Sequence, residues 1–378
     1  MAESSKVIPV FQPLLEAEEL DACRQALEDG WLGMGRSVGH FEDELSAFLA
    51  LGDRRIAAVS TGHAALHLAM LVAGVGRGDE VITPSFNNIA DLQAVLACGA
   101  TPVFCDVRDD TLCIDLEQVE GLLSPRTKAI VATDYGCHLS DHDHLGALRE
   151  AHGVRAIHDA AHSFGATYNN RMIGSFSDIA IFSFDPVKTI TCIDGGAVVV
   201  QSQEELESLH EMRLIGMGQA ASVMYQNQRA WSYDVKRIGF RYHLANLHAA
   251  LGLSQLQKME RITANRRRYF DIYTSRLDGI NQLRTPKTTH PGSVPFLFYV
   301  RVPSEVRVPF RQHLSAHGVD TGIHWQPGHL MQLFEGCPRG DLSVTEVVGQ
   351  EIVSLPFHSS MSDGTIERVV EAARSFWN

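Results

Sequence analysis

The sequence predicts an α/β fold with a mainly parallel sheet, and three observations indicate it. Short apolar runs alternate with helical patterns between residues 54 and 200. The runs are apolar throughout rather than alternately polar, which is typical of strands buried on both faces of a sheet. The chain has 378 residues, too many for one small core, so we expect a large domain and a smaller α+β domain at the C-terminus.

The expected strands and helices follow one another in order along the first part of the chain. The strands are residues 54–60, 80–84, 101–107, 129–133, 155–159, 179–184 and 197–200. Between the earlier strands we expect helices at residues 63–72, 90–98, 116–123 and 144–152. Strands separated by helices favour parallel pairing, because the helix carries the chain back to the starting edge of the sheet.

After residue 204 the pattern changes to longer helices. We expect a helix over residues 244–256 with a charged continuation to about Arg268, then a strand at residues 296–302. A further helix is expected at residues 16–28. We therefore predict a large domain of residues 1–240, which includes the N-terminal arm, and a small domain of residues 241–378.

Composition excludes several classes of function. The formal net charge of -13 disfavours a nucleic-acid partner, because phosphate binding requires a basic surface. No stretch approaches the roughly 20 apolar residues that a membrane helix requires, so we expect no membrane partner and a cytoplasmic location. The seven cysteines are scattered and never form a C-x-x-C pair, which indicates reduced thiols.

Ligands of open α/β sheets bind at the carboxyl ends of the strands, so the residues after each strand are candidates for a site. The first candidate is the turn around Gly62, where a strand leads through glycine into an apolar helix. Free backbone N–H groups and the helix dipole would hold an anion such as a phosphate there. Many strand-to-helix turns look the same, so this signal is weak alone.

Two further strand ends carry ionisable side chains. Asp159 ends one strand, where a buried carboxylate requires a cation or hydrogen bonds, although it could also simply cap a helix. Lys188 follows another strand among apolar and aromatic residues, which would depress its pKa and free the amine for Schiff-base chemistry. The alternative for Lys188 is an ordinary surface lysine. Together with an anion site, these residues would match the aldehyde, pyridine nitrogen and phosphate of pyridoxal 5'-phosphate (PLP).

The same segments, in the same order, resemble the DegT/DnrJ/EryC1/StrS family of sugar aminotransferases, which have the fold type I architecture of PLP-dependent transferases. The resemblance covers nearly the whole chain. The matching stretches are Gly30-Trp31-Leu32 with Gly35 and Phe41-Glu42, residues 62–71, residues 78–82, residues 98–104, Asp159-Ala160-Ala161-His162, residues 182–188, and residues 249–253.

The resemblance implies a role for each of these residues. Lys188 forms the Schiff base and moves protons, and Asp159 pairs with the pyridine nitrogen. The remaining implied cofactor contacts are His162 at the ring hydroxyl and Gly62, His63, Ala64 and Ser183 at the phosphate. The implied substrate contacts are Trp31, Gly33, His324 and His329, although the two histidines could instead be structural.

Three positions depart from the family pattern. The family usually has threonine at His63, an aromatic residue that stacks on the cofactor at Asn88, and asparagine at Arg241. That asparagine normally reaches the PLP phosphate of the neighbouring subunit. We therefore expect Arg241 to bind an anion, either the PLP phosphate or a substrate diphosphate, with a simple salt bridge as the alternative.

A cluster of histidines and aspartates suggests a metal site at first sight. It comprises His138, Asp141, His142, Asp143 and His144. Consecutive residues at a helix start point in different directions, and Asp141 is an ordinary capping residue. We therefore predict no metal.

The resemblance predicts a homodimeric PLP-dependent aminotransferase with active sites at the subunit interface. It would move an amino group from an amino-acid donor, L-glutamate by resemblance, to a nucleotide-linked keto-sugar. One alternative is a PLP-dependent sugar dehydratase of the same fold, but those enzymes carry histidine in place of the lysine. A second alternative is a PLP-binding regulator without turnover, which the acidic charge and the lack of a DNA-reading motif disfavour.

Overall fold

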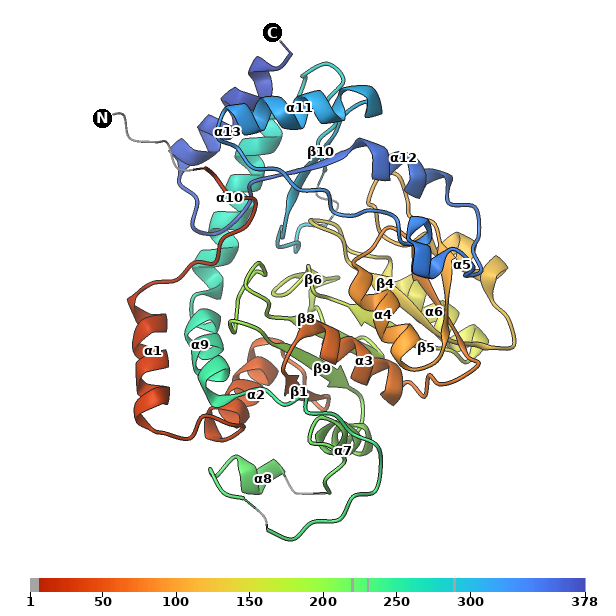
Figure 1. Ribbon diagram of the computed structural model, residues 1–378, viewed down its shortest axis with the longest axis vertical. Helices are drawn as coiled ribbons and strands as arrows, with labels where there is room; N and C mark the ends of the chain where they lie inside the picture. The colour runs from red at the N-terminus through yellow and green to blue at the C-terminus, as the bar shows by residue number, and fades with distance from the viewer. Residues whose placement is uncertain (1–6, 219–220, 230, 288–289, 378) are drawn as a thin grey trace.

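The computed structural model describes residues 7–218, 221–229, 231–287 and 290–377. Its centre is a seven-stranded sheet of order β1-β9-β8-β5-β4-β2-β3 (Figure 1). The strands are β1 (Arg55–Val59), β2 (Glu80–Pro84), β3 (Thr101–Cys105), β4 (Thr127–Thr133), β5 (Arg155–Asp159), β8 (Ile179–Ser183) and β9 (Gly196–Val200). Only β9 of these seven runs antiparallel to its neighbours. The predicted mainly parallel sheet is confirmed.

Helices cover both faces of this sheet, because its strands are apolar on both sides. One face packs against α3 (Gly62–Val72), α4 (Ile89–Ala97) and α7 (Gln203–Met212). The other face packs against α2 (Arg36–Phe48) and α9 (Asn246–Leu256) at one end, and against α5 (Leu116–Leu122) and α6 (His142–His152) at the other. Along β1, Ile56 and Ala58 face one layer while Ala57 and Val59 face the opposite layer.

The C-terminal part has its own core around the antiparallel pair β10 (Phe298–Arg301) and β11 (Ile352–Leu355). Its helices are α10 (Met259–Leu277), α11 (Ser304–Ala316), α12 (Ser343–Glu351) and α13 (Asp363–Ser375). The remaining elements are α1 (Ala17–Glu28), β6 (Thr167–Tyr168), β7 (Arg171–Met172), α8 (Ala221–Met224), and the 3-10 helices Gly328–Leu330 and Gln332–Phe334. The expected continuous helix to Arg268 is wrong, because α9 ends at Leu256 and a new helix starts at Met259.

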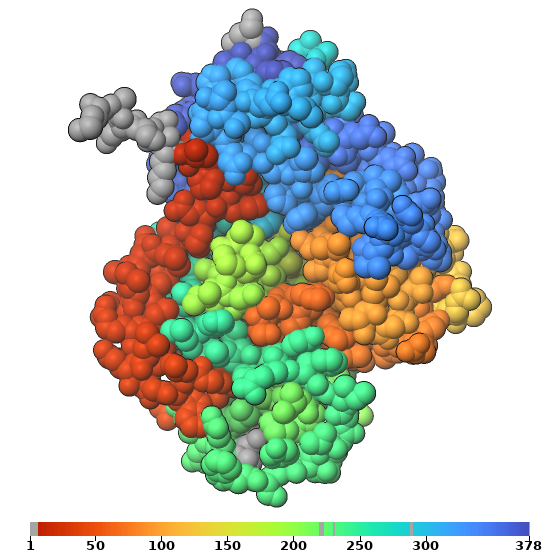
Figure 2. All heavy atoms as spheres, viewed as in Figure 1, coloured from red at the N-terminus to blue at the C-terminus, as the bar shows by residue number. Residues whose placement is uncertain are grey.

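The two parts of the chain lie directly against each other, and Figure 2 shows the blue C-terminal elements seated on the orange segments of the sheet region. Phe86 and Tyr135 of the first part share a core cluster with Phe296 and Tyr299 of the second. Helix α9 packs against α1 and α2, whereas α10 packs against α13. The boundary between residues 240 and 241 stays a prediction. No described helix is long and apolar enough to cross a membrane.

A buried ion pair between Arg213 and Glu42 connects α2 to the edge strand β1. Arg213 is fully buried, and its guanidinium donates to Glu42 Oε1 at 2.5 Å and to the Ala58 carbonyl at 2.6 Å. Tyr225 also hydrogen-bonds to both ionic side chains. Removing one partner of a buried pair leaves the other charge uncompensated.

Glu42→Ala is therefore expected to lower the free energy of unfolding by about 3–5 kcal/mol. The matched control is Glu367→Ala, which removes an exposed pair with Arg276 at 2.8 Å and should cost at most about 1 kcal/mol. Urea unfolding of both variants measures the difference. Equal losses in the two variants would contradict this account of the buried pair.

Candidate active site

A cavity of about 380 Å³ lies at the carboxyl ends of the parallel strands, bordered by the C-terminal part. Its lining comes from the ends of five strands. Thr133, Asp159 and Ser183 are the last residues of β4, β5 and β8. The residues that follow strands are Thr61, Gly62 and His63 after β1, Asn87 and Asn88 after β2, His162 after β5, and Lys188 after β8. Phe296, His324 and Trp325 close it from the C-terminal part. The strand ends that the sequence singled out therefore meet in one cavity, as open α/β sheets predict.

Lys188 projects into this cavity from the segment after β8. Its Nζ lies 4.6 Å from the centroid of the Phe296 ring. Burial lowers the pKa of this amine below its usual value, although Asp159 and Asp185 oppose the change. A larger fraction of the amine is therefore neutral, which is the form that attacks a carbonyl.

Asp159 is the last residue of β5, is buried, and lines the cavity. Its Oδ1 accepts a hydrogen bond from the Ala161 amide at 2.9 Å. Burial raises the pKa of this carboxyl group, while the Ala161 amide and the charge of Lys188 oppose the rise. A carboxylate in this position is suited to hold a protonated ring nitrogen.

His162 lies in the next turn after Asp159, and its ring stacks on Phe296 with centroids 4.1 Å apart. Burial and Lys188 lower the pKa of His162 well below its usual value, so the imidazole is neutral. Its Nδ1 accepts from the Gly136 amide at 3.4 Å. The ring proton is therefore on Nε2, which can donate to an oxygen atom in the cavity.

The start of α3 lies against Ser183 and forms the anion-binding end of the cavity. A Cβ atom added at Gly62 would lie 2.6 Å from Ser183 Oγ, so only glycine allows this approach. Thr61 caps the helix, and its hydroxyl accepts from the Ala64 amide at 2.8 Å. The amides of Gly62 and His63, the Ser183 hydroxyl and the positive end of the helix dipole remain to hold an anion.

The residues of this cavity fit PLP. Lys188 offers an amine for the aldehyde, Asp159 a carboxylate for the ring nitrogen, and His162 a donor for the ring hydroxyl. The glycine turn and Ser183 offer donors for the phosphate. This donor set, brought together from the ends of β1, β5 and β8, is the reason to place the cofactor here.

Two of the other predicted site residues also line the cavity. Asn88 caps α4, and its side chain accepts from the Ala90 amide at 2.9 Å. His324 Nδ1 lies 2.8 Å from Ser354 Oγ. Burial and the charge of Lys188 lower the pKa of His324 to about 4, so it is a neutral polar group of the cavity wall.

The remaining predicted site residues lie outside the described lining of this cavity, namely Trp31, Gly33, Ala64, Arg241 and His329. Trp31 Nε1 donates to the Met34 carbonyl, and the Gly33 carbonyl accepts from Asn246. His329 is buried, with Nδ1 at 2.7 Å from Ser85 Oγ. Arg241 is exposed within the chain. The roles given to these residues stay predictions.

Several lining residues were not predicted from the sequence, namely Phe11, Asn87, Asp91, Thr133, Phe296 and Trp325. Thr133 ends a predicted strand, and that position could have drawn attention to it. Asp91 resembles an ordinary acidic residue in the first turn of a helix. Phe296 and Trp325 reach the cavity only through the packing of the C-terminal part, which has no local sequence signal.

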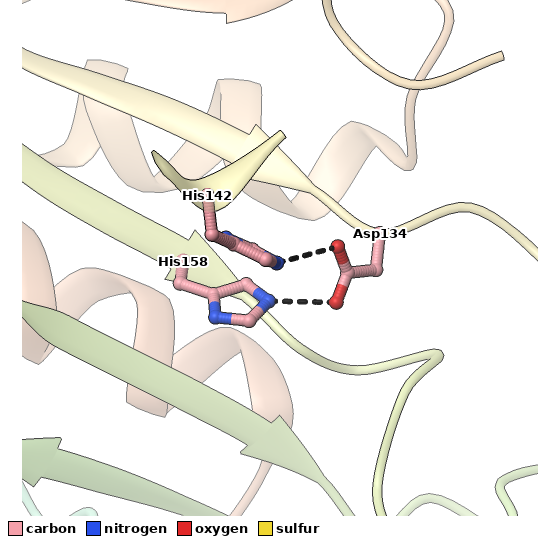
Figure 3. A group of neighbouring side chains, drawn as sticks. All are labelled: Asp134, His142 and His158. Carbon is pink, nitrogen blue, oxygen red and sulfur yellow. Dashed lines mark hydrogen bonds and ion pairs between the residues drawn. The ribbon is translucent and has the colours of Figure 1, made fainter. Parts of the chain in front are cut away.

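A second polar cluster consists of Asp134, His142 and His158, the residue that precedes Asp159 on β5 (Figure 3). His158 Nε2 lies 2.7 Å from Asp134 Oδ2, and His142 Nε2 lies 3.2 Å from Oδ1. Burial would raise the pKa of Asp134, but the two histidines more than offset it and hold it well below its usual value.

Each of these side chains offers one possible metal-ligand atom, but those atoms already contact one another. The Asp134 amide also donates to the Asp159 carbonyl at 3.1 Å. We interpret the cluster as a buried hydrogen-bonded group that supports the β5 strand end, and the absence of a metal stays a prediction. The predicted cap is confirmed, because Asp141 Oδ1 accepts from the His144 amide at 3.0 Å.

Comparison with known proteins agrees with this geometry. The chain is 33% identical over 376 residues to the spore coat polysaccharide biosynthesis protein SpsC of Bacillus subtilis (strain 168), covering 97% of this chain and 96% of that protein. The crystal structure of the aminotransferase TlmJ from Streptoalloteichus hindustanus matches with a TM-score of 0.90 and 31% identity, covering 97% of this chain and 98% of TlmJ.

Helicobacter pylori PseC, an aminotransferase involved in the biosynthesis of pseudoaminic acid, matches with a TM-score of 0.91 and 25% identity. This match covers 98% of the present chain and 99% of PseC. Residues 13–374 match the DegT/DnrJ/EryC1/StrS aminotransferase family, whose members use PLP. The chain belongs to the DegT/DnrJ/EryC1/StrS aminotransferase family and is a PLP-dependent enzyme.

Proposed function

We propose that this aminotransferase moves an amino group from L-glutamate to a keto-sugar carried on a nucleotide. The observation that carries the proposal is the meeting of Lys188, Asp159 and the glycine turn of α3 in one cavity. The similarity to SpsC and PseC supports a sugar as the acceptor. The cytoplasmic location and the lack of nucleic-acid and membrane partners stay predictions.

Each of three side chains in the cavity has a separate role in the proposed reaction. Lys188 would hold the cofactor through its aldehyde, and its amine, when free, would move the proton from the substrate Cα as base and acid. Asp159 would hold the ring nitrogen protonated, and His162 would donate to the ring hydroxyl from Nε2. When bound, PLP supplies the electron sink that takes up negative charge as the Cα proton leaves. Donor and acceptor use the same cavity in turn, which predicts ping-pong kinetics.

The nucleotide link can be tested directly. The cofactor-loaded enzyme is first converted with L-glutamate and then mixed with keto-sugars that do or do not carry a nucleoside diphosphate. We expect amino-sugar formation from the nucleotide-linked compounds at least about tenfold faster than from the free sugars, because remote contacts contribute binding energy. Equal rates for both kinds of acceptor would contradict the nucleotide link.

We also infer a homodimer with shared active sites. Trp231 and Ile238 are 89% and 84% exposed and lie in the segment that leads to Arg241. Exposed apolar residues gathered on one segment are typical of a protein interface. Sedimentation of the full chain should give the mass of two subunits at micromolar concentration.

In the proposed dimer, Arg241 of one subunit would reach into the active site of the other subunit. It is exposed within one chain, as a residue that reaches a neighbouring subunit must be. We propose that it binds the PLP phosphate of the partner subunit, because its forked guanidinium would replace the hydroxyl that is missing at His63.

Arg241→Ala is expected to weaken PLP retention by about tenfold, the effect of losing one charge-assisted hydrogen bond. Arg241→Asn should restore part of it, because an amide still donates to phosphate. PLP dissociation and the KM for the sugar are measured separately. Unchanged PLP retention in both variants, with a raised KM, would place Arg241 at the substrate instead.

A further inference from the structure

A second carboxyl group lies in the cofactor cavity beside Asp159. Asp91, in the first turn of α4, is fully buried and lines the same cavity. Its Oδ2 accepts from Asn87 Nδ2 at 2.7 Å, and the same amide nitrogen donates to Thr133 Oγ1 at 2.8 Å. Asp91 Oδ1 is buried and has no hydrogen-bond partner among the described residues. Thr133 is in turn the register partner of Asp159 across β4 and β5, so this chain of contacts places Asp91 near Asp159 in the cavity that both residues line.

The positive charge around this pair is too small to balance two carboxylates. Lys188 is the one lysine or arginine that lines the described cavity, and burial lowers its own pKa. The other titratable side chains around the pair are Asp185, Asp194, His63, His162, His324 and, behind Asp159, His158. Burial lowers the pKa of His63, His162 and His324, so these rings add no charge. Two buried, adjacent carboxylates therefore cannot both be ionised.

The hydrogen bonds indicate which group keeps the proton. Asp159 accepts a backbone N–H bond from Ala161, and donors to a carboxylate favour its ionised form. Asp91 has one side-chain amide donor and an unpartnered Oδ1. Its position at the start of α4 favours ionisation, but this effect is small beside the burial of a second adjacent charge. Burial and the neighbouring Asp159 raise the pKa of Asp91 well above its usual value.

We propose that Asp91 and Asp159 form a carboxyl pair that shares one proton, in which protonated Asp91 donates a hydrogen bond to ionised Asp159. Asp91 is then a positioning residue. It orients the Asp159 carboxylate and lowers its basicity, which leaves the proton on the cofactor ring nitrogen. This positioning role rests on the proposed function, in which Asp159 contacts the ring nitrogen. The proton shared by Asp91 and Asp159 does not depend on that contact.

The protonation state is tested by infrared difference spectroscopy of the full chain, before and after PLP is added. Asp91→Asn keeps the shape of the side chain, because its carbonyl can accept from Asn87 and its NH2 can donate to Asp159. The wild-type minus Asp91→Asn spectrum at neutral pH should contain the carbonyl stretch of a protonated carboxylic acid. Asp185→Asn, in a half-buried carboxyl group of the same cavity, is the control and should show no such band. If the wild-type minus Asp91→Asn spectrum lacks the carbonyl stretch of a protonated acid, the proposal is overturned.

The positioning role is tested by comparing two replacements of Asp91. Asp91→Leu removes the donor while keeping the branched shape of the side chain, and it should lower kcat by about 10- to 100-fold with little change in KM, the effect of losing a hydrogen bond to a charged group. Asp91→Asn should stay within about threefold of wild type. If Asp91→Asn is as impaired as Asp91→Leu, the donated hydrogen bond is not what matters. If Lys188 fails to bind PLP, the proposed function fails. The infrared band of protonated Asp91 does not depend on the bond between Lys188 and PLP, so the two failures can be distinguished.

Discussion

Lys188→Ala is expected to abolish turnover and the visible absorbance of the lysine-bound cofactor. The fold should survive, because the change removes an amine in an open cavity and leaves no large void in a packed core. Lys188→Arg should be equally inactive, since a guanidinium stays protonated and cannot form the covalent link. Absorbance spectra and amino-transfer assays of the purified variants measure both effects.

The control for this experiment is Lys128→Ala at the start of β4, where the side chain is exposed and does not line the cavity. It should keep both the absorbance and the rate. A Lys188→Ala protein with wild-type absorbance would refute the assignment of Lys188.

Asp159→Asn is expected to keep the covalent cofactor and lose about a hundredfold or more of the rate. The neutral amide no longer holds the ring nitrogen protonated when negative charge develops on the ring. Single-turnover kinetics with the donor amino acid measure the rate at which the donor loses its Cα proton. Asp141→Asn exchanges one good helix cap for another and should leave the rate unchanged. Turnover by Asp159→Asn at the wild-type rate would remove Asp159 from the mechanism.

Much of the fold could be predicted because its strands are buried on both faces. Each of the seven central strands coincides with a predicted apolar run to within a few residues. The carboxyl ends of these runs then indicated where to look for Gly62, Asp159 and Lys188, and the structure brings all three into one cavity. The direction of β9 could not be read, because an apolar run looks the same in both orientations.

The features that were missed depend on contacts between distant segments. The break between α9 and α10 has no proline or glycine at Gln257 and Lys258, so the helical pattern continues across it. Asp91 has the sequence context of a helix start, and only tertiary packing places it beside Asp159. His329 matches the family pattern near the substrate, yet it lies buried against Ser85 rather than along the described cavity lining.

The most direct test of the central claim is one half-reaction, in which the purified PLP-loaded protein is mixed with L-glutamate and no sugar. The account predicts release of about one 2-oxoglutarate per active site, together with loss of the lysine-bound absorbance, and neither change in Lys188→Ala. Glutamate that stays unchanged beside a cofactor still bound to Lys188 would contradict the proposal that this enzyme takes its amino group from L-glutamate.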